Sequence, residues 1–309
     1  MDALDLPEPN ADGFIRTPRN RYRYKYSNEE GVLMWLFYFA RVGTLSDVSR
    51  VFGGSTSRSS QVINDMTQRI YRRWGHRIEG SDLRHMERFI TDHAIAVVRH
   101  VGGAGNLPWH VGLPVAFVDA KCLKICRPIW GEDLCYSGYK HMHSLNFQIL
   151  GRPDGIVEDL YGGIEGRHSD PFLFNGSHLG RRFHMMRNRV WDNEYAGAHS
   201  WPLFKMYADG IYAITTEMGR NFREPLSAGQ AAANALMATM RGAIEHMFAN
   251  VSNLFRRVHY SRANKILASP VTTQYIVAHL FTNAHSCFYG NQTQKFFNMP
   301  KPNIYEYFS

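Results

Sequence analysis

The sequence predicts an α/β protein in which a mixed sheet flanked by helices follows an all-α segment. Three observations support this class. Residues 144–150 alternate strictly between polar and apolar side chains, which is the pattern of a half-buried strand. The turn-forming run Arg-Pro-Asp-Gly at 152–155 separates this predicted strand from an apolar run over 156–164, which is the pattern of a hairpin. Upstream, residues 27–74 repeat apolar side chains at helical spacing instead.

Three short helices are expected between residues 27 and 74. Ser27 caps the first, which stops near Gly43, and a double glycine at 53–54 ends the second. The third opens with a run rich in Ser, Arg and Gln. This order is typical of a helix-turn-helix, whose second helix enters the major groove of DNA. A small helical bundle with a solvated polar face is the alternative.

The helix-turn-helix hypothesis assigns two kinds of contact to the third helix. Arg58 and Gln61 are the residues expected to face bases, because they lie near its start. Arg69, Arg72 and Arg73 suit phosphates. A formal net charge of +8 for the chain favours a polyanionic partner in the same way.

Three segments are predicted along the chain. Residues 1–26 form a basic and aromatic arm, 27–105 a helical domain, and 106–309 the sheet domain, with the boundary in the glycine-rich run after one amphipathic helix over 81–101. Basic residues and tyrosines interleave in the arm, which suits a phosphate backbone. Packing of these tyrosines on the next domain is the alternative.

Several classes of protein do not fit the sequence. Four cysteines in 309 residues give no disulfide framework, so a reducing, intracellular setting is expected. No apolar run approaches the roughly 20 residues of a membrane span, and the acidic N-terminus lacks the apolar core of a secretory signal. No phosphate-binding Gly-x-x-x-x-Gly-Lys-Ser/Thr motif is present, so nucleotide hydrolysis has no support.

Four acids stand at the ends or starts of expected elements. Asp119 and Asp209 each follow an apolar run read as a strand, Asp170 lies in the first turn of a helix capped by Ser169, and Glu245 lies within a long helix. Taken singly, such residues are usually turn formers, caps or members of surface ion pairs. For Glu245 the expected ion-pair partner would be Arg241, four residues earlier.

Taken together, the elements follow the order of the ribonuclease-H-like fold: strand, hairpin, helix, strand, acid-bearing helix. Carboxylates of that fold hold two Mg²⁺ or Mn²⁺ ions, and hard oxygen ligands suit both metals. Two such ions about 3.5–4 Å apart clamp the attacking and leaving oxygens of an in-line phosphoryl displacement. The spacing of the acids therefore favours a divalent-metal site.

The sequence also resembles the PIF/Harbinger-type DDE transposases, over about residues 115–290. The motifs that carry the resemblance are Tyr136-Ser-Gly-Tyr-Lys-x-x-His-Ser-Leu-Asn-Phe-Gln148, Pro153-Asp-Gly155, Gly162-x-x-Glu-Gly-Arg-His-Ser-Asp170, Ala208-Asp-Gly-Ile-Tyr212 and Arg241-x-x-x-Glu-His-Met-Phe248. Three features depart from the family pattern: Ala120 replaces a glycine, the segment between the second and third acids is longer, and Thr282-Asn-Ala-His285 stands for Leu-His-Asn.

The resemblance implies a metal-dependent endonuclease that cuts double-stranded DNA at transposon ends and joins the 3′-hydroxyl to target DNA. Asp119, Asp170, Asp209 and Glu245 would be its catalytic and metal-binding acids, with Mg²⁺ or Mn²⁺ as cofactor. The fold argument favours three of them, Asp119, Asp209 and Glu245, as the core triad. The resemblance further implies a nuclear protein, assembled as a homo-oligomer on DNA and working with a Myb-like partner.

Other hypotheses stay open at this stage. A domesticated, non-cutting DNA- or chromatin-binding protein on the same scaffold is one, and a nuclease for RNA or hybrids is another. A zinc site built from Cys122, Cys126 and Cys135 with His141 and His143 is conceivable, although sheet packing explains the cysteines better. The Arg- and His-rich residues 176–202 are expected to be an irregular surface segment.

Overall fold

A computed structural model describes residues 4, 6, 13–17, 24–103, 107, 112–195 and 204–309, without the side chains of residues 233, 236 and 241. Its strands are β1 (Ile15–Arg16), β2 (Lys25–Tyr26), β3 (Leu113–Lys124), β4 (Tyr136–Ser137), β5 (Met142–Gly151), β6 (Val157–Glu165), β7 (Phe204–Ala208) and β8 (Met218–Arg220). Its α-helices are α1 (Asn28–Ala40), α2 (Leu45–Phe52), α3 (Thr56–Trp74), α4 (Arg84–Arg88), α5 (Ile90–His100), α6 (Glu132–Cys135), α7 (Asp170–Ser177), α8 (Leu179–Val190), α9 (Ala228–Leu254), α10 (Val271–Tyr289), α11 (Gln292–Phe296) and α12 (Ile304–Tyr307).

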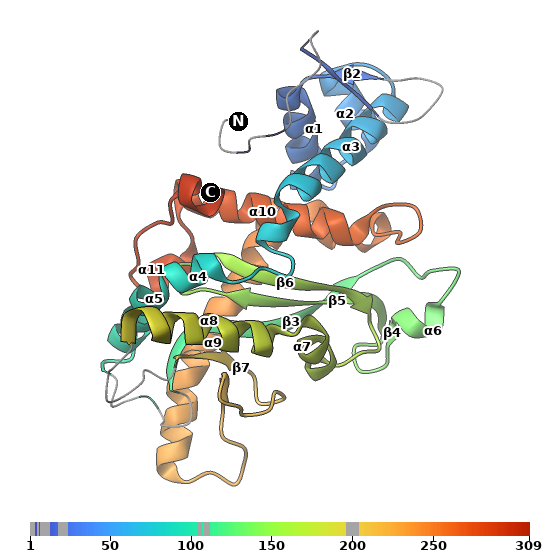
Figure 1. Ribbon diagram of the computed structural model, residues 1–309. Helices are drawn as coiled ribbons and strands as arrows, with labels where there is room; N and C mark the ends of the chain where they lie inside the picture. The colour runs from blue at the N-terminus through green and yellow to red at the C-terminus, as the bar shows by residue number, and fades with distance from the viewer. Residues whose placement is uncertain are drawn as a thin grey trace.

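The main sheet is mixed. Strand β5 runs antiparallel to both of its neighbours, β6 and β3, while β7 and then β8 continue the sheet in parallel with β3. The short strand β4 pairs antiparallel with the first residues of β5. Helices cover both faces, with α7 and α8 in front of the sheet and α9 behind it in Figure 1. This mixed sheet flanked by helices fits the predicted ribonuclease-H-like class.

Alternation along β3 assigns its side chains to two buried clusters. Phe117 packs in a cluster with Ile149 of β5 and with Met247 of α9. Val118 points to the opposite face, in a cluster with Phe183 of α8, Met86 of α4 and Ile90 of α5. The sheet thus has one face for α9 and α10 and one for α4, α5, α7 and α8.

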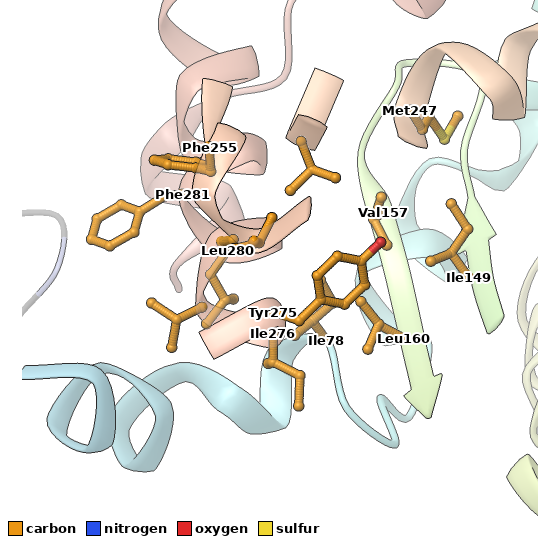
Figure 2. Packing of buried hydrophobic residues seen from close by; sticks show 14 of the residues in the cluster. Ile78, Ile149, Val157, Leu160, Met247, Phe255, Tyr275, Ile276, Leu280 and Phe281 are labelled. Atoms are coloured by element: carbon orange, nitrogen blue, oxygen red, sulfur yellow. The ribbon is translucent and has the colours of Figure 1, made fainter. Parts of the chain in front are cut away.

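The hydrophobic core extends from the sheet into the N-terminal helices without a break. Trp35 of α1 is fully buried, and its ring lies 4.9 Å from that of Phe281 on α10 and 5.3 Å from that of Phe255. Helix α3 also packs on α10, which lies between α1–α3 and the sheet in Figure 1. Figure 2 shows how Phe255 and Phe281 continue into Leu280, Tyr275 and the strand residues of the sheet.

Several expected elements are confirmed. Helices α1, α2 and α3 lie where they were predicted, and Ser27 caps α1 by accepting a hydrogen bond from the Glu30 amide at 3.1 Å. The hairpin β5–β6 turns at residues 152–155, as its turn signal indicated. Ser227 and Gln230 form a capping box at the start of α9. The boundary proposed near residue 105 and most of the arm over 1–26 lie outside the described residues, so this division stays a prediction.

Three expectations are wrong. Strand β3 does not end at Asp119 but continues to Lys124, because residues 119–124 pair with residues 144–149 of β5. The single helix expected over 81–101 is two helices that meet at Phe89, where the backbone leaves the helical region (φ −117°, ψ 13°). Before the first of them, which begins only at Arg84, Asp159 of β6 accepts a hydrogen bond from the Ser81 amide.

The third wrong expectation is the irregular segment over 176–202. Residues 179–190 of it form the regular helix α8, and the last residues, 196–202, lie outside the described part of the chain. All four cysteines are free thiols. Among the described helices, none is both long and apolar enough to cross a membrane.

Candidate active site

Asp119 and Asp209 occupy equivalent places on neighbouring parallel strands. Val118 of β3 pairs with Ala208 of β7, and the two aspartates follow directly. Both line a small cleft of about 10 Å³ together with Ile244 of α9. Such a cleft has room for about one water molecule or ion between the carboxylates. The structure therefore brings together two acids that lie 90 positions apart in the sequence.

Backbone amides orient both carboxylates. Asp119 Oδ1 accepts a hydrogen bond from the Ala120 amide at 2.8 Å, and Asp209 Oδ1 accepts one from the Gly210 amide at 2.6 Å. The Gly210 carbonyl in turn accepts from Arg220 Nη1 at 2.6 Å and from Arg223 Nη2 at 2.9 Å. The loop after Asp209 is thus fixed from the edge strand β8, which limits the positions that the Asp209 carboxylate can take.

Glu245 lies on the helix that covers the same face of the sheet. Its neighbour Ile244 lines the cleft, and Phe248, one turn later, packs beneath the Lys121 ammonium at 5.2 Å from the ring centre. Lys121 is two residues after Asp119 on β3 and so points to the same face. Glu245 itself is exposed and does not line the cleft, although it directly follows Ile244, which does. The expected ion pair between Glu245 and Arg241 stays a prediction, because the structure does not describe the side chain of residue 241.

Asp170 approaches from the opposite face. It is the first residue of α7, and Ser177 at the other end of this helix accepts a hydrogen bond from Gln148 of β5 at 3.2 Å. Burial raises the pKa of the Asp170 carboxyl, the Lys140 ammonium opposes this, and the charge of Asp209 adds to it. The fourth acid is therefore within electrostatic reach of Asp209 but does not line the cleft.

Tyr212 is a residue whose place the sequence did not indicate. Its ring is buried beside that of Phe174, and its hydroxyl has no hydrogen-bond partner within the described structure. Burial raises its pKa, and the charges of Asp170, Asp119 and Asp209 raise it further. Tyr212 therefore stays a neutral phenol, and it lies within electrostatic reach of three of the four acids. In the sequence, the one indication that Tyr212 lies near the acids was its place in the motif Ala208-Asp-Gly-Ile-Tyr212, which contains Asp209.

Lysines supply positive charge next to the acids. Burial lowers the pKa of Lys121, and the nearby Asp119 opposes that shift. Lys140 lies close enough to Asp170 to lower the pKa of its carboxyl. An ammonium beside Asp119 and another beside Asp170 reduce the repulsion between carboxylates and suit the approach of a phosphodiester.

The residues expected to bind DNA fall into different environments. Arg58 is only 17% exposed and forms an ion pair with Glu30 at 2.6 Å, and Gln61 Oε1 accepts a hydrogen bond from Thr17 at 3.2 Å. Arg72 is exposed near the end of α3, and the Arg73 guanidinium stacks over the Trp74 ring at 4.6 Å. Arg69 lies close enough to Asp65 to lower the pKa of that carboxyl, although burial raises it more.

The donor set of the cleft fits a hard divalent cation, because it consists of carboxylate oxygens. In the part of the chain that the structure describes, no three His, Cys, Asp or Glu side chains are placed as one metal-ligand set. The structure thus gathers two of the four acids, Asp119 and Asp209, in one cleft, which neither Asp170 nor Glu245 lines. The zinc hypothesis gains no support, since Cys126 hydrogen-bonds the Ser261 carbonyl and Cys135 is buried in the core.

A mixed sheet with paired carboxylates on adjacent parallel strands, beneath an acid-bearing helix, defines the class of ribonuclease-H-like nucleases. Residues 118–280 match the family model described as DDE superfamily endonuclease. The match spans more than half of the chain and contains all four candidate acids. The chain belongs to the DDE superfamily endonucleases and is an enzyme of this class. Searches of curated proteins and of solved structures found no match.

Proposed function

We propose that this chain is a metal-dependent DNA endonuclease that acts as a PIF/Harbinger-type transposase. The observation that carries the proposal is the pair Asp119 and Asp209, which share one cleft beneath α9. Membership of the DDE superfamily endonucleases supports the chemistry. The motifs around Lys140, Asp170 and Glu245 support the subtype, through the resemblance described above.

In this proposal Asp119, Asp209 and Glu245 would hold Mg²⁺ or Mn²⁺, and Asp170 would act as a nearby fourth acid. Such ions, when bound, supply charge stabilisation for phosphoryl displacement. The chain contributes fixed geometry, because the Ala120 and Gly210 amides hold one oxygen of each aspartate. The ammonium groups of Lys121 and Lys140 would face the phosphodiester chain.

Two displacements make up the proposed reaction. In the first, water attacks the phosphorus at a transposon end, the bond to the 3′-oxygen breaks, and a 3′-hydroxyl and a 5′-phosphate result. In the second, that 3′-hydroxyl attacks a phosphorus of target DNA, a new phosphodiester forms, and the 3′-oxygen of the target leaves with a proton. No oxidant or nucleotide is needed for either step.

Helices α1–α3 would locate the transposon ends as a helix-turn-helix unit, with Arg69, Arg72 and Arg73 near phosphates. The turn between α2 and α3 is short, as that motif requires. Nuclear location, assembly of several copies on DNA and a Myb-like partner protein belong to the same proposal, on the strength of the resemblance alone.

Nicking of supercoiled plasmid by the full chain tests the proposal. Wild type should nick the plasmid with Mn²⁺ and not with EDTA, whereas Asp119→Ala should bind the plasmid equally and leave it intact. Equal binding without cutting by either protein would favour a non-cutting DNA-binding protein instead. Faster cleavage of RNA or RNA–DNA hybrids than of duplex DNA would contradict the transposase assignment.

A further inference from the structure

One flank of helix α3 is occupied by contacts within the chain. Arg58 Nη2 donates to Glu30 at 2.6 Å and to the Lys25 carbonyl at 3.1 Å. Three and seven residues later, Gln61 accepts from Thr17 at 3.2 Å and Asp65 accepts from the Tyr26 hydroxyl. Strand β2 supplies two of these four partners, and Thr17, directly after β1, supplies a third, so the ribbon β1–β2 lies along this flank. Arg58 and Gln61 are therefore poor candidates for base recognition.

The neighbouring stripe of the same helix is open. Ser57, Asn64 and Arg72 are exposed, and Ser60 and Gln68 are half-buried. Within the described structure no hydrogen bond occupies the side-chain amides of Asn64 and Gln68. Positions 57, 60 and 64 have the spacing i, i+3, i+7 that a recognition helix presents to base edges. The opposite side of α3 packs in the core through residues such as Met66.

We infer that Asn64 and Gln68 read A·T base pairs in the major groove of DNA, with Ser57 and Ser60 beside them. A carboxamide matches adenine, because its oxygen accepts from the N6 amino group while its nitrogen donates to N7. This inference rests on the proposed function, which supplies DNA as the partner, and adds the side chains that read it and the base that they select.

The charge of the helical unit favours DNA over a protein as the occupant of this stripe. Residues 24–74 contain seven Lys and Arg against four Asp and Glu. Arg72 is exposed two turns after Asn64, where a phosphate would follow a contacted base. An apolar partner surface would find few contacts on a row of hydroxyls and amides.

Selection of duplexes from a random-sequence DNA pool by the full chain tests the inference. Wild type should enrich a site with adenine at fixed positions. Asn64→Ala and Gln68→Ala should each weaken binding to the enriched duplex by about fivefold or more and lose the preference at one position. Gln61→Ala is the matched control on the same helix, and it should keep the preference. Melting temperatures near that of wild type would show that the exposed variants fold.

A second measurement tests whether a protein side chain contacts N7 of the preferred adenine. Replacement of the preferred adenine by 7-deazaadenine removes N7, so it should weaken binding by wild type and leave binding by one of the two variants unchanged. The inference is overturned if wild type enriches no sequence, or if Gln61→Ala changes the preference and Asn64→Ala and Gln68→Ala do not. Plasmid nicking by the same preparations separates the two proposals, because it depends on Asp119 and not on Asn64.

Discussion

Asp119 and Asp209 stand side by side because Val118 and Ala208, the residues directly before them, are register partners on parallel strands. A register shift of one residue would turn one of the two carboxylates to the other face of the sheet. The site therefore depends on the pairing of β3 with β7, which is fixed in turn by the burial of Phe117 and Tyr207 on one face.

Asp119→Asn should abolish Mn²⁺-dependent DNA cleavage, whereas Asp170→Asn should retain at least ten times more activity than Asp119→Asn. Asp119 lines the cleft, but Asp170 starts a helix on the opposite face. The measurement is the rate of plasmid nicking at saturating Mn²⁺. Equal loss in both variants would place Asp170 among the direct ligands.

Trp35→Ala should lower the free energy of unfolding by about 3–5 kcal/mol, because it empties a fully buried ring site between α1 and α10. The whole chain should still unfold in one transition, since the core is continuous from α1 to the sheet. Urea titration followed by both circular dichroism and tryptophan fluorescence checks this. Two separate transitions would show that the helical segment is an independent domain.

Arg152→Met should destabilise the protein by about 3–5 kcal/mol. Arg152 is fully buried at the β5–β6 turn, where it bonds Glu158 at 2.9 Å and Asp154, and the substitution leaves both carboxylates buried without their cation. The control is Arg50→Met, because Arg50 is 78% exposed and its pair with Asp47 is worth little. Similar urea midpoints for the two variants would contradict the role assigned to the buried pair.

Stability should fall as the pH drops from about 6.5 to 4. Burial lowers the pKa of His279 and of His259 to about 4, so the unfolded chain takes up protons in this window that the folded chain does not. Each such histidine adds a slope of about 1.4 kcal/mol per pH unit. The stability contribution is complete above the unfolded pKa and is lost on acidification.

His279→Gln isolates one part of that slope. The variant has one fewer buried imidazole, so its unfolding free energy should depend less steeply on pH between 6.5 and 4 than that of wild type. Urea titrations at several pH values in this window give the two slopes. Parallel slopes would mean that His279 takes up no extra proton on unfolding.

Local patterns predicted the parts of the fold that local interactions determine. The β5–β6 hairpin has alternating side chains and a turn sequence of its own, and the caps at Ser27 and Ser227 bind amides three residues away. These contacts lie within the reach of sequence reasoning because donor and acceptor are close along the chain.

Long-range pairs explain what the sequence did not reveal. Helix α8 looked like a polar surface segment because it is rich in arginine, yet Arg182 and Arg187 pair with Asp159 and Glu217 on other elements. Its apolar residues, Leu179, Phe183, Met186 and Val190, do recur at helical spacing, so this signal was present. Arg58 is similar, since its partner Glu30 lies 28 residues away.

The sequence predicted which acids belong to the candidate site, but it did not predict how they are arranged in space. The motifs indicated Asp119, Asp170, Asp209 and Glu245, but which face each one takes depends on strand register and helix packing. Asp119 and Asp209 share a cleft through β3 and β7, whereas Asp170, at the start of α7, lies within electrostatic reach of Asp209 but does not line that cleft.

Anomalous diffraction from a crystal of the full chain soaked in Mn²⁺ tests the central claim most directly. We expect a manganese peak between the carboxylates of Asp119 and Asp209, within ligand distance of both and on the side of Glu245, and we expect it to vanish in Asp119→Asn. A peak bound only at other residues, or one that persists unchanged in Asp119→Asn, would contradict the account.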